Sequence, residues 1–177
     1  MKKLLLHICC APCCSVPIKR LKDHGFDVSC FFYNPNIYPA SEELKRRDEV
    51  MNFLEKERIP YLAEDGDHDE WLSAIKGLEL EPEGGSRCLK CYEMRIRRTA
   101  EIAKEQRFDA ISVTLTLSPH KNAEKINEIG REVVREFGLE FIEEDFKKQD
   151  GFKESIEISC EEGFYRQNYC GCEFSRR

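Results

Sequence analysis

The chain has 177 residues and a mass of 20.7 kDa, a length that favours one compact domain over two. Hydrophobic residues make up 41% and charged residues 35%, which argues against a disordered, collagen-like or membrane-embedded chain. The 28 lysines and arginines and 34 aspartates and glutamates leave a net charge of −6. That balance excludes a uniformly basic nucleic-acid binder but leaves room for a local basic patch.

The first part of the chain reads as a strand, a helix and a second strand. Residues 3–8 form a short apolar run, typical of a buried strand. A helix is expected next, with Pro12 or Pro17 in its first turn and Gly25 as its end. The β-branched and aromatic residues 27–33 predict the second strand.

The middle of the chain continues this alternation. Turn residues at 34–36 precede a predicted helix that has Ser41 as its N-cap and runs past Leu54. Residues 60–63 predict a short third strand, and residues 67–75 a helix.

The remaining elements follow a loop that contains a proline and two glycines, residues 80–87. Residues 88–106 predict a long helix and residues 109–117 a strand. Residues 123–137 predict an amphipathic helix, and residues 139–142 a last strand.

Strands that alternate with helices predict βαβ units and a mainly parallel sheet in a Rossmann-like, three-layer α/β fold. We expect a single domain over residues 1–177, in which residues 1–150 form the α/β core. Residues 151–177 form a C-terminal segment with no assigned element. Ligands of such sheets bind beyond the carboxyl ends of the strands, and that is where Cys9 and Cys10 are expected.

Ten cysteines are an unusual number for this length, and they indicate either a secreted disulfide framework or a metal or redox site. The apolar run at residues 4–6 is broken by His7 and is too short for a signal peptide. No stretch approaches the ~20 apolar residues of a membrane span. We therefore expect a cytoplasmic protein without a membrane partner, whose thiols stay reduced and serve a metal or redox role.

The first cysteine group lies at residues 9–14 (CCAPCC), at an expected strand-to-helix turn. Amide groups at a helix start favour thiolates, the form that binds metals and acts as a nucleophile. The alternative is a set of inert buried thiols, which is the preferred interpretation for Cys14.

The second group is Cys88 and Cys91, whose spacing places both sulfurs on one face of a first helical turn. Together with the first group they complete the four sulfurs of a Zn²⁺ site or a [4Fe–4S] cluster. The alternative is a simple packed helix start.

The third group is Cys170 and Cys172, which flank Gly171 near the end of the chain. A disulfide across one residue closes a very small and easily reduced ring, which suits a redox pair. The alternatives are further metal ligands or two idle thiols. Cys30 and Cys160 are interpreted as packed or incidental.

Basic and aromatic residues lie near these groups. Residues 165–169 (YRQNY) suit base stacking and phosphate binding, or form an ordinary solvated tail. Basic runs at residues 45–47 and 87–98 are either solvated faces or phosphate-binding surfaces.

Five motifs occur in the order in which a known family carries them. They are residues 7–13 (HICCAPC), 32–37 (FYNPNI), 88–92 (CLKCY), 118–122 (SPHKN) and 165–172 (YRQNYCGC). With these motifs the chain resembles the QueH-type epoxyqueuosine reductases from residue 4 to about residue 175. The resemblance implies a cobalamin-independent iron–sulfur oxidoreductase that reduces epoxyqueuosine at the wobble position of tRNA to queuosine, the last step of queuosine synthesis.

The resemblance also implies roles for individual residues. Cys170 and Cys172 match the redox-active pair, and Cys13 is the surplus thiol that a second metal, such as a mononuclear iron, would use. An electron donor is implied but not identified. The positions that match the ligands of the [4Fe–4S] cluster are Cys9, Cys10, Cys88 and Cys91.

Other residues, most of them in these motifs and basic runs, are candidates for substrate and tRNA binding. Asp145, His7 and Tyr33 are candidate proton donors by residue type alone. The candidate binding residues are Tyr33, Asn34, Tyr92, Arg95, Ser118, Asp145, Tyr165, Arg166 and Gln167.

Two functions of other classes compete with this interpretation. A PP-loop-type tRNA-modifying ATPase has a similar alternation of elements, but its phosphate loop needs glycines that residues 9–12 lack. A non-catalytic zinc module that binds RNA would use the same sulfurs as ligands of Zn²⁺, and such a protein would be colourless.

Overall fold

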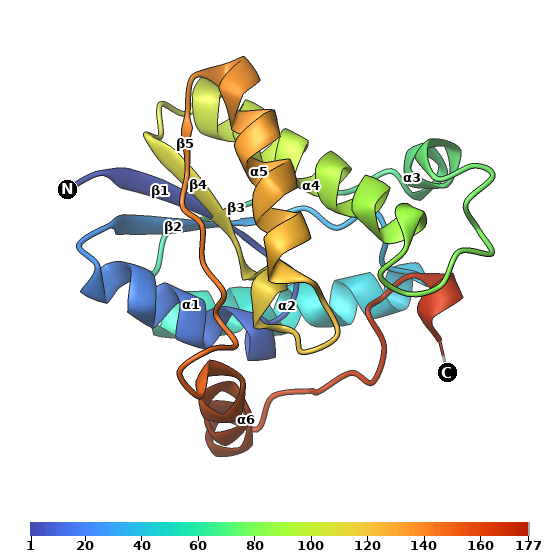
Figure 1. The fold of residues 1–177 in the computed structure, drawn as a ribbon. Helices are drawn as coiled ribbons and strands as arrows, with labels where there is room; N and C mark the ends of the chain where they lie inside the picture. The colour runs from blue at the N-terminus through green and yellow to red at the C-terminus, as the bar shows by residue number, and fades with distance from the viewer. Residues whose placement is uncertain (177) are drawn as a thin grey trace.

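The structure, a computed structural model, describes residues 1–176 as a five-stranded sheet with helices on both faces (Figure 1). The strand order is β3-β2-β1-β4-β5, and all neighbouring strands run parallel. The predicted α/β fold class with a parallel sheet is confirmed. The strands are β1 (Lys3–Ile8), β2 (Asp27–Phe32), β3 (Tyr61–Ala63), β4 (Ala110–Val113) and β5 (Glu140–Phe141).

The helices form the two outer layers. Figure 1 shows α4 and α5 over one face of the sheet and α1 and α2 over the other, with α6 against the outer side of α1. None of the helices in residues 1–176 is both long and apolar enough to cross a membrane. The helices are α1 (Ala11–Asp23), α2 (Ala40–Lys56), α3 (His68–Ala74), α4 (Ser86–Glu105), α5 (Ala123–Phe137) and α6 (Gly151–Glu162).

The core has two halves, one on each face of the sheet. Alternate residues of a strand point to opposite faces, so Leu4 and Leu6 pack under α1 and α2 while Leu5 packs under α4 and α5. All three leucines are fully buried. The central strand therefore reads as a continuous apolar run, as expected for a parallel sheet that is covered on both sides.

Most predicted elements are present, and two agree with the structure at both ends, β1 and α5. The predicted N-cap of α2 is wrong, because the helix already begins at Ala40 and Ser41 lies inside it. The amides of Glu42 and Glu43 donate to the carbonyl of Pro39 instead, over 2.9 and 3.3 Å. Pro12 lies in the first turn of α1, whereas Pro17 lies within the helix.

The predicted strand over residues 109–117 is also wrong in its second half. β4 ends at Val113, opposite His7 of β1, and residues Thr114–Leu117 form a 3-10 helix. These residues are buried beside β1, α1 and α5, and the hydroxyl of Thr116 accepts a hydrogen bond from the amide of Phe146 over 3.4 Å. Packing of this turn, rather than β propensity, decides its conformation.

Helix α6 has no counterpart in the prediction. Its buried positions are Gly151, Ser155 and Ser159 rather than large apolar residues. Both serine hydroxyls bond to carbonyls within the helix, so they are satisfied without water. The sequence of α6 shows no amphipathic pattern, because the positions that are buried hold glycine and serine instead of apolar side chains.

Candidate metal centre and active site

The first cysteine group lies where the chain turns from β1 into α1, beyond the carboxyl end of the central strand. The sulfurs of Cys9, Cys10 and Cys13 all lie within 4.8 Å of one another, and those of Cys9 and Cys10 are 3.8 Å apart. Hydrophobic packing does not require three sulfurs to converge, whereas a metal does. Cys14 points away into the core and donates to the carbonyl of Ala11 over 3.3 Å.

The pKa values of the thiols in this group are shifted in opposite directions. Hydrogen bonds from Cys10 and Cys13 hold the pKa of the Cys9 thiol well below its usual range. The pKa of Cys13 is raised because its thiol is hydrogen-bonded to Cys10 and Cys9. A lowered pKa at Cys9 favours the thiolate, which is the form that binds metals, and metal binding to the group displaces thiol protons.

The second cysteine group occupies the first turns of α4, as predicted. The sulfur of Cys88 accepts a hydrogen bond from the amide of Gly84 over 3.3 Å. Cys91 is buried in a small cluster with Trp71 and Cys172, and this burial raises its pKa to about 11. A thiol of the second group and one of the third therefore lie in the same cluster.

Arg95, one turn further along α4, is the buried cation of the site. Its side chain is 1% exposed, and it donates to the side-chain oxygen of Asn34 over 2.7 Å. Asn34 in turn donates to the carbonyl of Ile8, at the end of β1. The nitrogen Nε of Arg95 has no partner within residues 1–176, and its charge interacts with the thiols of Cys91, Cys9 and Cys170. A buried, incompletely paired guanidinium beside thiols fits an anionic metal–thiolate group.

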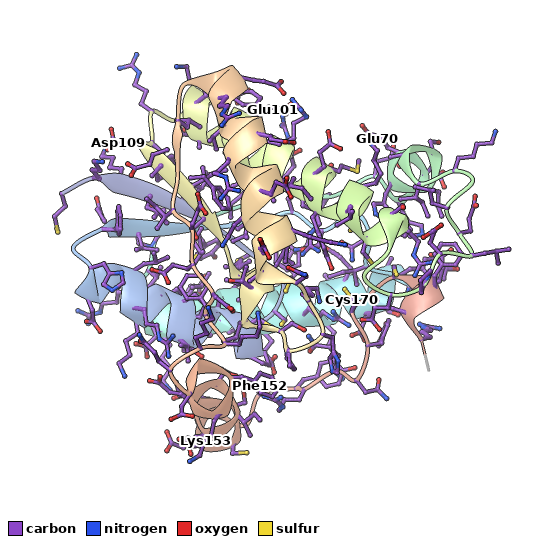
Figure 2. The ribbon with its side chains drawn as sticks, in the orientation of Figure 1. Glu70, Glu101, Asp109, Phe152, Lys153 and Cys170 are labelled. Atoms are coloured by element: carbon purple, nitrogen blue, oxygen red, sulfur yellow. The ribbon has the colours of Figure 1, made fainter. Side chains whose placement is uncertain are left out.

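The C-terminal tail, residues 163–176, brings the third group to the same place. It leaves α6 and runs back beside α2 (Figure 1). Gln167 donates a hydrogen bond to the sulfur of Cys10 over 3.1 Å. Cys170, labelled in Figure 2, and Cys172 are both free thiols.

A cavity of about 200 Å³ opens between these elements. The thiol residues on its wall come from two of the three groups: Cys9, Cys13 and Cys170. Its wall also includes Phe152 of α6, which Figure 2 labels. Four predicted binding residues line it, Arg95, Ser118, Arg166 and Gln167.

Lys121 is a cavity residue that sequence reasoning did not assign to the site. Although burial opposes the charge, the nearby thiol of Cys170, the phenol of Tyr92 and the thiols of Cys9 and Cys13 raise the pKa of Lys121. Its place in the SPHKN motif was the one available signal. Phe152 and Ser155 were missed as well, because α6 itself was not predicted.

The other predicted binding residues are not among the residues on the cavity wall. Tyr33 and Tyr92 are buried, and the ring of Tyr33 stacks on that of Phe31. The hydroxyl of Tyr165 donates to Glu42 over 3.2 Å. Asp145 accepts from Lys147 over 2.6 Å.

The three candidate proton donors, His7, Tyr33 and Asp145, are not among the residues on the cavity wall. His7 is fully buried, with its Nε2 2.9 Å from the carbonyl oxygen of Tyr33, and burial together with Arg95 lowers its pKa to about 3. Burial raises the pKa of Tyr33 to about 12, and its side chain is not on the cavity wall. Lys121 is on the cavity wall, together with Arg95 and Arg166.

Comparison with known proteins gives a consistent result. The family model "Epoxyqueuosine reductase QueH" matches residues 4–177. A curated relative of that name from Acinetobacter baylyi is 43% identical over 176 residues, which cover 99% of this chain and 81% of the relative. A second relative of the same name, from Thermotoga maritima, is 38% identical over 180 residues, which cover 99% of this chain and 91% of the relative.

A solved structure also matches, the U34-tRNA thiolase NcsA from Methanococcus maripaludis with its [4Fe–4S] cluster. The TM-score is 0.62 at 14% sequence identity, a likeness of fold alone. The match covers 99% of this chain but 62% of the thiolase, so this chain spans less than two thirds of that protein.

Proposed function

Because this chain belongs to the epoxyqueuosine reductase QueH family, we propose that its three cysteine groups together form the reaction centre of that enzyme. The chain is an oxidoreductase that reduces epoxyqueuosine, and the family match over residues 4–177 is the observation that carries this activity. The convergence of thiols on one cavity supports the assignment of the chemistry to this place. We propose that the substrate is the modified nucleotide at the wobble position of a tRNA.

The proposed cofactor is a [4Fe–4S] cluster on Cys9, Cys10, Cys88 and Cys91. The buried guanidinium of Arg95 supports a cluster in this region, because it interacts with the thiols of Cys9, Cys91 and Cys170 and a cluster with four thiolates carries negative charge. Such a cluster supplies electrons one at a time. Cys13, which shares its site with Cys9 and Cys10, is the ligand left for a second metal such as a mononuclear iron.

The proposed dithiol is Cys170 and Cys172. Reduction of an epoxide to an alkene breaks both C–O bonds, forms a C=C bond and releases water, which requires two electrons and two protons. Two thiols supply both when they become a disulfide, so the reaction balances as epoxide plus dithiol to alkene, disulfide and water. An electron donor, not yet identified, then restores the dithiol.

Positively charged side chains on the cavity wall suit a reaction in which the epoxide oxygen and the tRNA phosphates carry negative charge. Lys121 faces the space shared by Cys9, Cys13 and Cys170, where its ammonium can stabilise negative charge on the epoxide oxygen. Arg166 lies on the same wall in the exposed part of the tail, where it can contact a tRNA phosphate.

Two competing functions are less well supported. The turn after β1 is lined with thiols and lacks the glycines with which an ATP-binding loop cradles phosphate. A zinc module that only binds RNA would not need the Cys170 thiol on a cavity wall beside Cys9 and Cys13.

The test is anaerobic purification with iron and sulfide quantification, electron paramagnetic resonance and a turnover assay on tRNA that carries epoxyqueuosine. We expect a brown protein that forms queuosine. Cys13→Ala separates one cluster from a cluster with a second metal, because only the second metal should be lost from this variant. A colourless, zinc-loaded protein without reductase activity would contradict the proposal.

A further inference from the structure

A buried arginine of α2 contacts the backbone on which the dithiol is carried. Arg46 is 1% exposed, although it lies in a basic run that reads as a solvated face. It does not line the cavity of about 200 Å³, so it has no direct access to a substrate there. Its guanidinium points instead into the tail.

Each side of the Arg46 guanidinium has a partner. Nε donates to Glu42, one turn earlier in α2, over 2.7 Å. Nη1 donates to the carbonyl of Cys170 over 3.0 Å, and Nη2 to that of Tyr169 over 3.4 Å. The Tyr169 ring centroid lies 5.1 Å from Cζ of Arg46, which adds a cation–π contact.

The next carbonyl of the tail is held by the same region of the chain. The amide of Tyr38, just before α2, donates to the carbonyl of Gly171 over 2.9 Å. Three successive carbonyls, of residues 169–171, are therefore bound by Arg46 and Tyr38. A segment with its carbonyls fixed in this way has a defined backbone path rather than that of a loose terminus.

Gly171 fits this path closely. Its φ of +130° is one that residues with a side chain rarely adopt. A Cβ at this position would lie 2.9 Å from Cγ1 of Ile37 and 3.2 Å from Nη1 of Arg46. The backbone between the two cysteines therefore lies directly against the arginine that binds it.

We propose that Arg46 is a positioning residue: its guanidinium holds residues 169–171 so that the Cys170 thiol faces the cavity while Cys172 stays buried beside Cys91. This role rests on the proposed function of the dithiol. The planar fork of an arginine can serve two adjacent carbonyls and a carboxylate together, which a lysine ammonium cannot match in geometry.

The test compares Arg46→Gln, Arg46→Lys and the control Arg47→Gln. Arg47 neighbours it in α2, but its partners are Asp65 and Glu43 rather than the tail. For Arg46→Gln we expect kcat to fall about 100-fold, the typical cost of misplaced reacting groups, with KM nearly unchanged. Arg46→Lys should recover part of kcat, and Arg47→Gln should retain the wild-type kcat.

A second measurement reports how firmly the tail is held and does not depend on turnover. Hydrogen exchange at the Tyr38 amide should become faster in Arg46→Gln, less so in Arg46→Lys, and remain unchanged in Arg47→Gln. If Arg46→Gln fails to fold, Arg46→Lys still tests the proposal through both readouts. Unchanged exchange and unchanged kcat in the Arg46 variants would overturn it, as would a loss confined to KM.

The proposal and the function on which it rests can fail separately. If Cys170→Ser retains turnover, the dithiol is not the reductant, and the proposed function of that pair fails. Faster Tyr38 exchange in Arg46→Gln would then still show that Arg46 holds the tail, but its role in the reaction would be refuted by an unchanged kcat.

Discussion

The side-chain nitrogen of Gln167 lies 3.1 Å from the sulfur of Cys10, to which it donates a hydrogen bond across 157 positions of the chain. The other end of this amide, Oε1, is buried without a partner among residues 1–176. A tail residue thus contacts the first cysteine group directly. This contact joins the proposed metal centre to the segment that carries the proposed dithiol.

Gln167→Leu should make the reduction potential of the cluster more negative, because a hydrogen bond to a ligand sulfur stabilises the reduced state. An anaerobic redox titration followed by electron paramagnetic resonance measures the potential. Asn168→Leu is the matched control, since Asn168 lies next in the tail and lines the cavity. Equal potentials in Gln167→Leu and wild type would show that the bond has no influence on the cluster.

Cys170→Ser and Cys172→Ser should each reduce kcat about 1000-fold or more, and the double variant should be no worse, because a dithiol acts as a unit. The visible absorption of the cluster should remain, since neither residue is a proposed cluster ligand. Steady-state assays on all three variants measure the loss. A double variant much slower than either single one would instead indicate independent roles.

Arg95→Met should lower metal affinity by about 10- to 100-fold, because it removes the buried cation near the thiols. Iron bound after anaerobic reconstitution against a competing chelator measures this. Arg97→Met is the control. Arg97 lies on the same helix, but its guanidinium is partly exposed and pairs with Glu136 over 2.6 Å. Equal iron retention in both variants would contradict a role for Arg95 in the centre.

Gly130→Ala should destabilise the fold by about 1–3 kcal/mol, even though alanine favours a helix by about 1 kcal/mol. Gly130 is a buried residue of α5, and a Cβ there would overlap the ring of Phe141 of β5. Denaturant unfolding measures the change in the free energy of unfolding. Phe141→Leu should relieve the overlap, so the double variant should lose less than the two single losses combined.

The elements that the sequence predicts well are those whose buried residues are apolar. β1 is predicted at both ends because residues 3–8 form a short apolar run, and α5 because its apolar stripe follows the period of a helix. Helix α6 was missed because Ser155 and Ser159 form its buried face. Periodicity is informative only where burial and hydrophobicity coincide.

The residues of the candidate site also differ in whether the sequence predicts them. The cysteine groups are visible as spacings within short segments, so the sequence alone singles out Cys9, Cys10 and Cys13. It does not single out Arg46 and Lys121, because their environment depends on segments far away in the chain. A lysine in a loop and an arginine in a basic run carry no local pattern that distinguishes a buried side chain from a solvated one.

The most direct test of the proposed dithiol reaction is a single turnover without added reductant. Protein that has been reduced anaerobically and freed of reductant is mixed with tRNA that carries epoxyqueuosine, and both nucleosides and C-terminal peptides are analysed by mass spectrometry. We expect one queuosine per protein molecule, together with a disulfide between Cys170 and Cys172. Formation of queuosine while both cysteines remain thiols would contradict it.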